Sequence, residues 1–223
     1  AWKMEGSRMF IREGTEVKVS DLIRGIVIQS GNDASVAMAE FIAGDEQAFA
    51  DSMNQMAQKL GMTRTHFKNA TGLPDEGHYT TAKDLSLLAL ALISDFPEHY
   101  KVYKEKYFSY NDIRQANRNS LLWRDDAVDG IKTGHTDAAG FCLVASAEKN
   151  DMRLVSVVMG ATSERSRSSE SQKLINYGFR YFESVKLYDG FESLRRVKVW
   201  GGLHESLDVG IEAPARLTIP KGA

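Results

Sequence analysis

Two short sequences contain residue types that could carry out acyl-transfer chemistry. The sequence S-G-N at residues 30–32 combines a hydroxyl with a carboxamide, and K-T-G at residues 132–134 combines an amine with a hydroxyl and a glycine. A serine hydroxyl is a weak nucleophile or proton relay unless a neighbouring base activates it. Either sequence alone is weak support for a site, because an ordinary turn is the alternative for both.

The first sequence lies in a predicted turn between two helical segments. Ser20 with Asp21 resembles an N-cap ahead of a helical turn, and residues 34–43 are predicted as a helix that stops at Gly44. Residues 29–33 interrupt these segments. We expect such a turn to direct its polar side chains away from the helix packing.

Further helices surround this turn in the sequence. Asp45 is the predicted N-cap of a helix that ends at Gly61, and its apolar residues recur at helical spacing. The sequence T-A-K-D at residues 81–84 resembles a capping box for the next helix. A long helix is predicted over about residues 163–182.

The second sequence lies in a region with strand character. Residues 128–134 are predicted as turn and strand, and two β-rich runs at 141–147 and 152–159 flank a hairpin turn. Residues 107–110 indicate a short strand, and a polar stretch follows from 111 to 119. After residue 190 only strands are predicted, near residues 195–200, 206–211 and 216–219.

This order of elements predicts the fold class. Helices come first, an antiparallel sheet follows and a helix closes the run, which is typical of an α+β domain with helices packed on a sheet. We predict one domain over residues 1–190 and the beginning of a small β-rich domain over 191–223.

Composition excludes several classes of protein. The chain is 43% hydrophobic and 26% charged, with a net charge of −2 and both signs mixed, so we expect no nucleic-acid partner. No apolar run approaches the length of a membrane span. The five histidines lack metal-ligand spacing, so neither a metal nor a cofactor is expected. The single cysteine, Cys142, is expected to be a small buried apolar residue.

The two motifs together resemble the active-site serine penicillin-recognising enzymes, whose set is S-x-x-K, then S-x-N, then K-T-G. The wider sequences at residues 28–33 and 129–136 are most similar to low-molecular-mass D-alanyl-D-alanine carboxypeptidases. Further likeness extends over nearly the whole chain, at residues 22–25, 104–107, 117–123 and 217–220. The resemblance implies a penicillin-binding, transpeptidase-like fold.

The resemblance also implies roles for the polar residues of the first motif and for the lysine of the second. Ser30 would relay a proton, and Asn32 would hydrogen-bond the substrate backbone. Lys132 would supply positive charge near the anionic end of the substrate and support the serine.

Residues after the lysine would bind the substrate. Thr133 would hydrogen-bond the terminal carboxylate, Gly134 would leave room for the substrate backbone, and the backbone N–H of His135 would form half of an oxyanion hole. Arg118 and Arg167 match positions that line the family's site, where either could hold the carboxylate. The alternative for each arginine is an ordinary surface residue.

The activity implied is removal of the terminal D-Ala from peptidoglycan stem pentapeptides by a serine acyl-enzyme mechanism, with acylation by β-lactams such as penicillin. The resemblance further implies a periplasmic protein, anchored at the periphery of the inner membrane in its full-length form.

The sequence departs from the family pattern in one respect. The 29 residues ahead of Ser30 contain no S-x-x-K sequence. The one match, Ser146 to Lys149, is rejected because it follows the K-T-G sequence and ends a predicted strand, whereas the chemistry needs a helix start. We therefore expect a piece of a longer protein, inactive by itself, whose nucleophile and base are not in this chain.

Two alternatives stay open. The first is a non-catalytic penicillin-recognition or peptidoglycan-binding module, which the missing first motif favours. The second is a β-lactamase, which needs a glutamate-bearing loop between the second and third motifs. No such loop is identified in the sequence.

Overall fold

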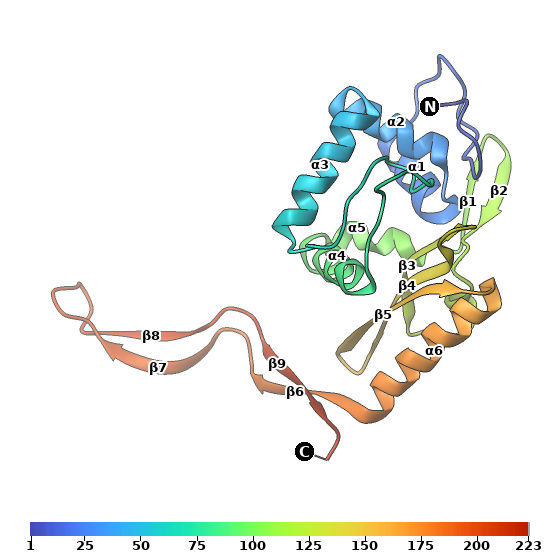
Figure 1. Ribbon diagram of the computed structural model, residues 1–223. Helices are drawn as coiled ribbons and strands as arrows, with labels where there is room; N and C mark the ends of the chain where they lie inside the picture. Colours follow the sequence, from blue (N-terminus) through green and yellow to red (C-terminus); the bar gives the residue numbers. More distant parts are fainter. Residues whose placement is uncertain (223) are drawn as a thin grey trace. The chain divides into compact units, whose positions relative to one another are not determined.

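The computed structural model describes residues 1–222 (Figure 1). These residues form two compact units. One comprises Ala1–Glu148 with Arg153–Ile175, and the other comprises Lys149–Met152 with the chain from Asn176 onward. Compactness does not show independent folding, so the predicted domain boundary at residue 190 stays a prediction. The first unit combines helices with an antiparallel sheet, which confirms the predicted α+β class.

The helical elements gather mostly in the first half of the chain. In order they are α1 (Val19–Arg24), the π-helical turn η1 (Gly25–Gln29), α2 (Asn32–Ala43), α3 (Glu46–Lys59), α4 (Ala82–Asp95), α5 (Pro97–Tyr100), the 3₁₀ turns η2 (Lys101–Lys104) and η3 (Ser120–Trp123), and α6 (Glu164–Tyr181).

The strands follow from the middle of the chain onward. They are β1 (Tyr107–Tyr110), β2 (Ile113–Ala116), β3 (Val128–Thr136), β4 (Gly140–Lys149), β5 (Met152–Ala161), β6 (Phe182–Tyr188), β7 (Glu192–Lys198), β8 (Ser206–Ile211) and β9 (Ala215–Pro220).

Local capping explains where several helices begin and end. The Asp45 carboxylate accepts a hydrogen bond from the N–H of Ala48, and the Thr81 hydroxyl accepts one from the N–H of Asp84, which confirms both predicted N-caps. Gly44 ends α2 with φ +88°, a conformation that glycine adopts without steric cost. The predicted cap at residues 20–21 is wrong. The helix begins at Val19, and no side chain caps it.

The sheet that carries the K-T-G sequence lies between helices. β3 pairs antiparallel with β4, and β5 lies on the other side of β4. Figure 1 shows α4 and α5 on one side of this sheet and the first turns of α6 on the other. Ala89 of α4, Tyr100 of α5 and Ile131 of β3 form one buried cluster. Burial of such apolar side chains fixes the helices against the sheet.

Two strands were not predicted. β2 lies in the stretch predicted as polar and pairs with β1 in a hairpin whose turn is formed by Asn111 and Asp112, both with positive φ. The predicted helix includes Phe182, which continues the helical apolar spacing but is the first residue of β6, and no element was predicted for the rest of this strand. Its pairing with β9, 27 or more residues later, decides its conformation.

The second unit contains the β-rich end of the chain. Here β6 pairs with β9 and β7 pairs with β8, each antiparallel. The strands predicted near residues 195–200, 206–211 and 216–219 correspond to β7, β8 and β9.

Candidate active site

Ser30 occupies a strained position between two helical segments. The π-helical turn η1 ends at Ser30, whose φ of 62° and ψ of 39° are left-handed, and α2 begins at Asn32. The N–H of Gly31 donates to the carbonyl of Gly25 at 3.0 Å and closes the turn. A left-handed serine costs of order 1 kcal/mol and persists only where its surroundings hold it. The Ser30 hydroxyl accepts a hydrogen bond from Lys132 Nζ, so it faces β3. That the turn directs its polar side chains away from the helix packing stays a prediction.

Asp33 holds this turn against the beginning of the chain. Its fully buried carboxylate accepts backbone N–H bonds from Met9 at 2.8 Å, Phe10 at 2.8 Å and Ile11 at 3.1 Å, and a further one from Ala34 at 2.9 Å. The sequence analysis missed this role. An acidic residue at the first turn of a helix was the only signal, and that position alone suggests a favourable interaction with the helix dipole.

Asn32 contacts the same segment of chain. Its side-chain N–H donates to the carbonyl of Glu5 at 2.7 Å, and its backbone N–H donates to the carbonyl of Ser7 at 2.8 Å. The carboxamide is 8% exposed. One of its donors is thus used within the chain, and its expected contact with a substrate backbone stays a prediction.

Lys132 of β3 reaches the Ser30 hydroxyl. Its Nζ donates to Ser30 Oγ at 2.8 Å and to the carbonyl of Thr133 at 2.6 Å. Burial of the amine, followed by repulsion from Arg118 and Arg167, lowers the pKa of Lys132 to about 8. The tertiary fold therefore joins the two motifs through one hydrogen bond.

The residues after Lys132 lie along β3 opposite β4. Thr133 is buried, whereas Gly134 and His135 are exposed. A Cβ placed on Gly134 would meet the Cys142 Cβ at 3.9 Å, an ordinary van der Waals contact, so no close approach requires a glycine here. The expected role of Gly134, leaving room for a substrate backbone, stays a prediction.

The two arginines differ in their surroundings. Arg167 of α6 is 2% exposed, and its Nη1 donates to the Gly134 carbonyl at 3.2 Å, so it is not an ordinary surface residue. Burial, together with the positive charge of Arg118, lowers the pKa of Arg167 although Glu164 opposes this effect. Arg118 is exposed, but its charge acts on both Lys132 and Arg167. Three cationic groups thus gather at one end of the site.

Phe141 connects two of the predicted residues. Its ring centroid lies 4.0 Å from that of His135, its partner across β3 and β4, and the Arg167 guanidinium carbon lies 5.6 Å from the same centroid. A guanidinium over an aromatic face is attracted by the ring. The sequence analysis did not single out Phe141, because only the strand pairing places it beside both residues.

A cavity of about 370 Å³ adjoins this site. Its lining is mostly apolar and comes mainly from η1, α4, β3 and β4, including Leu88, Ile131 and Leu143. Cys142 also lines it. The residue is half-buried, with Sγ 3.5 Å from the carbonyl of Ala139, so the expectation that it is buried is wrong.

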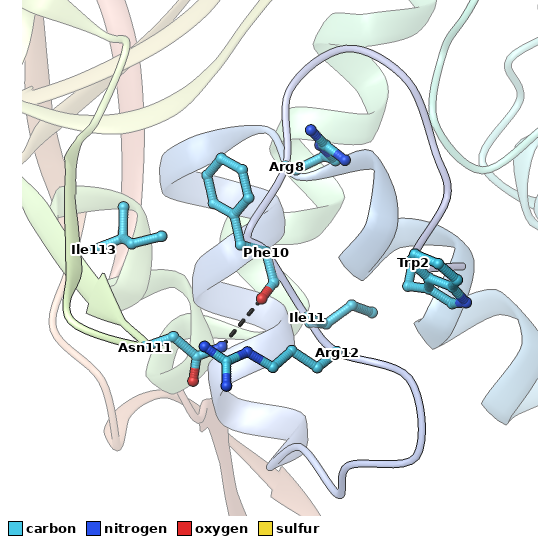
Figure 2. Close-up of a pocket in the computed structure, with 7 residues that line it drawn as sticks. All are labelled: Trp2, Arg8, Phe10, Ile11, Arg12, Asn111 and Ile113. Carbon is cyan, nitrogen blue, oxygen red and sulfur yellow. Dashed lines mark hydrogen bonds between the residues drawn. The ribbon is translucent and has the colours of Figure 1, made fainter.

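A second hollow, of about 320 Å³, is lined by residues near the chain start and by the β1–β2 turn. Figure 2 shows Arg8 and Arg12 at opposite ends of it, with Phe10 between them, and the Asn111 side chain donating to the Phe10 carbonyl at 3.1 Å. The backbone of this segment is held by Asp33, so the hollow lies close to the S-G-N turn.

The rejected S-x-x-K match lies within a strand. Ser146 and Lys149 both belong to β4, and the fully buried Ser146 hydroxyl accepts a hydrogen bond from Arg153 Nη1 at 2.7 Å. This arrangement does not place a lysine one helical turn after a serine, and it agrees with the rejection.

Two features are absent from the described residues 1–222. No group of three or more His, Cys, Asp or Glu side chains in that range is arranged to hold a metal ion. Within the same range, no helix has the length and apolar character that crossing a membrane requires.

Comparison with known proteins identifies the family. The sequence profile of the D-alanyl-D-alanine carboxypeptidase family matches residues 1–163. The chain is 49% identical over 217 residues to the D-alanyl-D-alanine carboxypeptidase DacA of Escherichia coli, covering 97% of this chain and 54% of that protein. The chain thus spans about half the length of this curated relative.

Solved structures agree with the sequence comparison. Penicillin-binding protein 5 from Haemophilus influenzae superposes with a TM-score of 0.87 at 43% identity, covering 98% of this chain and 64% of that chain. Penicillin-binding protein 6B from Escherichia coli gives a TM-score of 0.83 at 40% identity, covering 98% and 64%. These matches confirm the predicted penicillin-binding, transpeptidase-like fold. The chain belongs to the D-alanyl-D-alanine carboxypeptidase family of serine peptidases.

Proposed function

We propose that the protein carrying this chain removes the terminal D-alanine from peptidoglycan stem peptides that end in D-Ala-D-Ala. The reaction proceeds through a serine acyl-enzyme, and β-lactams such as penicillin acylate the same serine. The observation that carries the proposal is the 2.8 Å hydrogen bond from Lys132 Nζ to Ser30 Oγ, which brings together two motifs 102 residues apart.

In this proposal the residues of the two motifs act on the proton and on the peptide. Ser30 relays a proton between the acyl-enzyme serine and the leaving amine, and the Lys132 amine holds the relaying hydroxyl in place. Asn32 hydrogen-bonds the substrate backbone. A positioned proton relay contributes about 10²–10⁴-fold to such a reaction.

The residues at the end of β3 act on the substrate carbonyl and on its terminal carboxylate. The two arginines act on the same carboxylate. The N–H of His135 stabilises the oxyanion, and Gly134, which lacks a side chain, admits the extended peptide. Thr133 hydrogen-bonds the terminal carboxylate. Arg167 and Arg118 attract that carboxylate to the cationic end of the site, where Lys132 adds a third positive charge.

The acylated serine is not assigned within residues 1–223, because the sequence contains no S-x-x-K on a helix. The proposal also places the protein in the periplasm, peripherally attached to the inner membrane in its full-length form. The family relationship supports a serine nucleophile that lies outside residues 1–223, and it supports the location in the periplasm.

The test uses the protein purified in the form that the cell makes. Intact mass is measured before and after exposure to penicillin, the adduct is located by peptide mapping, and D-alanine release is measured from a diacetyl-lysyl-D-Ala-D-Ala peptide. A penicilloyl adduct outside residues 1–223 together with D-alanine release supports the proposal. An adduct on Ser146 overturns the assignment of motifs. Binding of the peptide without an adduct or release favours a non-catalytic module, and rapid penicillin turnover favours a β-lactamase.

A further inference from the structure

The strand that carries Lys132 contains an extra residue just before the K-T-G sequence. Val128 pairs with Ala147 of β4 and Gly130 pairs with Ser146, so Asp129 has no partner of its own in β4. Such a β-bulge places two residues of one strand against one of the other and changes the register of everything that follows. Every later pair, including Lys132 with Val144, therefore depends on the presence of this extra residue.

The Asp129 side chain is bonded to two neighbouring elements. Its two carboxylate oxygens accept from Arg153 Nη1 of β5 at 2.9 and 2.8 Å, and one of them accepts from the Tyr100 hydroxyl of α5 at 3.3 Å. The same Arg153 nitrogen donates to the hydroxyl of Ser146, the residue opposite Gly130. Charge-assisted bonds of this kind are shorter and stronger than neutral ones. Asp129 thus connects the bulge directly to β5 and α5, and through Arg153 to β4.

Gly130, the next residue, is held in place by two side chains. The Gly130 carbonyl accepts from the buried Asn119 side chain at 2.9 Å, and a Cβ at this position would lie 2.3 Å from the Tyr100 hydroxyl. The backbone has no room to exchange the bulged residue for its neighbour while these contacts persist. The bulge is therefore held at Asp129 by side chains from elements far apart in the sequence.

The presence of the bulge decides which way Lys132 points, because its loss would shift the later pairs by one residue. Successive side chains of a strand alternate between its faces, so a shift of one residue moves a side chain to the opposite face. Lys132 reaches Ser30 Oγ from its present face. We propose that Asp129 is a positioning residue, which through Arg153 and Tyr100 holds the bulge in place and so directs the Lys132 amine at Ser30. The catalytic part of this proposal rests on the proposed function, whereas the geometric part does not.

The principal variant is Asp129→Ala in the complete natural protein, with Asp129→Asn as a second variant that keeps an acceptor oxygen but not the charge. Two controls accompany them. Asp208→Ala breaks an Arg–Asp pair between two other strands, in which Arg196 binds at 2.8 and 3.0 Å. Ala57→Gly lowers stability by weakening a buried position of α3, outside the sheet that carries Lys132. Thermal midpoints of all four variants are measured first.

We expect kcat/KM for the D-Ala-D-Ala peptide to fall by about 100-fold in Asp129→Ala, because a small misplacement of a catalytic group has this effect. The fall should be mainly in kcat, and the alkaline limb of the pH profile should move upward as the amine leaves its buried position. Asp129→Asn should show the same changes to a smaller degree. Ala57→Gly and Asp208→Ala should retain the kcat and pH profile of the parent at temperatures where each is folded.

A crystal structure of whichever Asp129 variant folds provides the readout that does not depend on activity. The proposal expects the Lys132 Nζ to Ser30 Oγ hydrogen bond to be lost or the pairing of Gly130 with Ser146 to change. An unchanged register with Lys132 still bonded to Ser30 overturns it, as does a loss of activity no greater than that of Ala57→Gly. Absence of D-alanine release by the parent protein would instead refute the proposed function. The crystal structure would then decide the geometric part of the proposal by itself.

Discussion

The amine of Lys132 and the hydroxyl of Ser30 form a 2.8 Å hydrogen bond across 102 residues of sequence. The amine also donates to its neighbour's carbonyl, Thr133 O, at 2.6 Å. Because two positive arginines and burial act on this amine, its proton is held less tightly than that of a lysine in water. The pair therefore links the chemistry of the site to pH, and the first three predictions follow from it.

Replacing Lys132 with methionine should abolish activity without destabilising the fold. We expect D-alanine release to fall by at least about 100-fold, since a charged donor to the relay is removed. The free energy of unfolding at pH 7 should stay equal or rise, because burial disfavours the charged amine in the folded state. Urea unfolding and peptide hydrolysis measure the two effects. Lys173→Met, at an exposed lysine of α6, is the matched control. A large loss of stability in the Lys132 variant would contradict the prediction.

The same lysine predicts how stability changes with pH. Its pKa is about 8 in the folded protein and 10.5 in the unfolded chain, so the unfolded state binds more protons between these values. Stability from this group should therefore increase as pH rises from about 8 toward 10.5. The increase should be absent in Lys132→Met, and unfolding titrations of both proteins at several pH values measure it.

Activity should decline as pH rises through about 8, because the protonated amine is the form that donates to Ser30 and attracts the carboxylate. Removing the charge of Arg118 by Arg118→Gln should raise the pKa of Lys132 and move this limb to higher pH, whatever the variant does to the rate. The pH profile of kcat/KM locates the limb. A limb at the same pH in both proteins would show that Arg118 does not act on Lys132.

Loss of the Asp33 carboxylate should unfold the turn that presents Ser30. Asp33→Ala leaves the N–H groups of Met9, Phe10, Ile11 and Ala34 without their acceptor, and we expect a loss of about 3 kcal/mol of unfolding free energy. Asp45→Ala removes a single capping bond and should cost about 1 kcal/mol. Urea denaturation compares the two. Equal losses would mean that water replaces the carboxylate of Asp33.

Replacing Phe141 with a smaller side chain should change KM for the substrate more than kcat. Phe141→Leu removes the aromatic face beneath Arg167, a contact of about 1 kcal/mol, so KM should rise about fivefold. The kcat value should change less, because Lys132 and Ser30 are not touched. Phe191→Leu replaces an exposed phenylalanine of the second unit and should change neither constant. A fall confined to kcat would place Phe141 with the oxyanion side of the site, next to His135.

The sequence by itself determined the local features of this protein. The caps at Asp45 and Thr81 and the stop at Gly44 follow from side-chain and backbone chemistry within a few residues, and the structure confirms them. The motifs at residues 30–32 and 132–134 were likewise visible as residue types and order. Features of this kind need no knowledge of the rest of the chain.

Only the tertiary structure decided the contacts between distant segments. The bond from Lys132 to Ser30 and the bonding of Asp33 to the chain start require the fold. The bulge at Asp129 depends on Arg153, 24 residues later. A strand register is set by partners that are remote in sequence, and a buried polar group is defined by what satisfies it. Single-sequence patterns carry neither kind of information, which is why the residues that position the site had to be found in three dimensions.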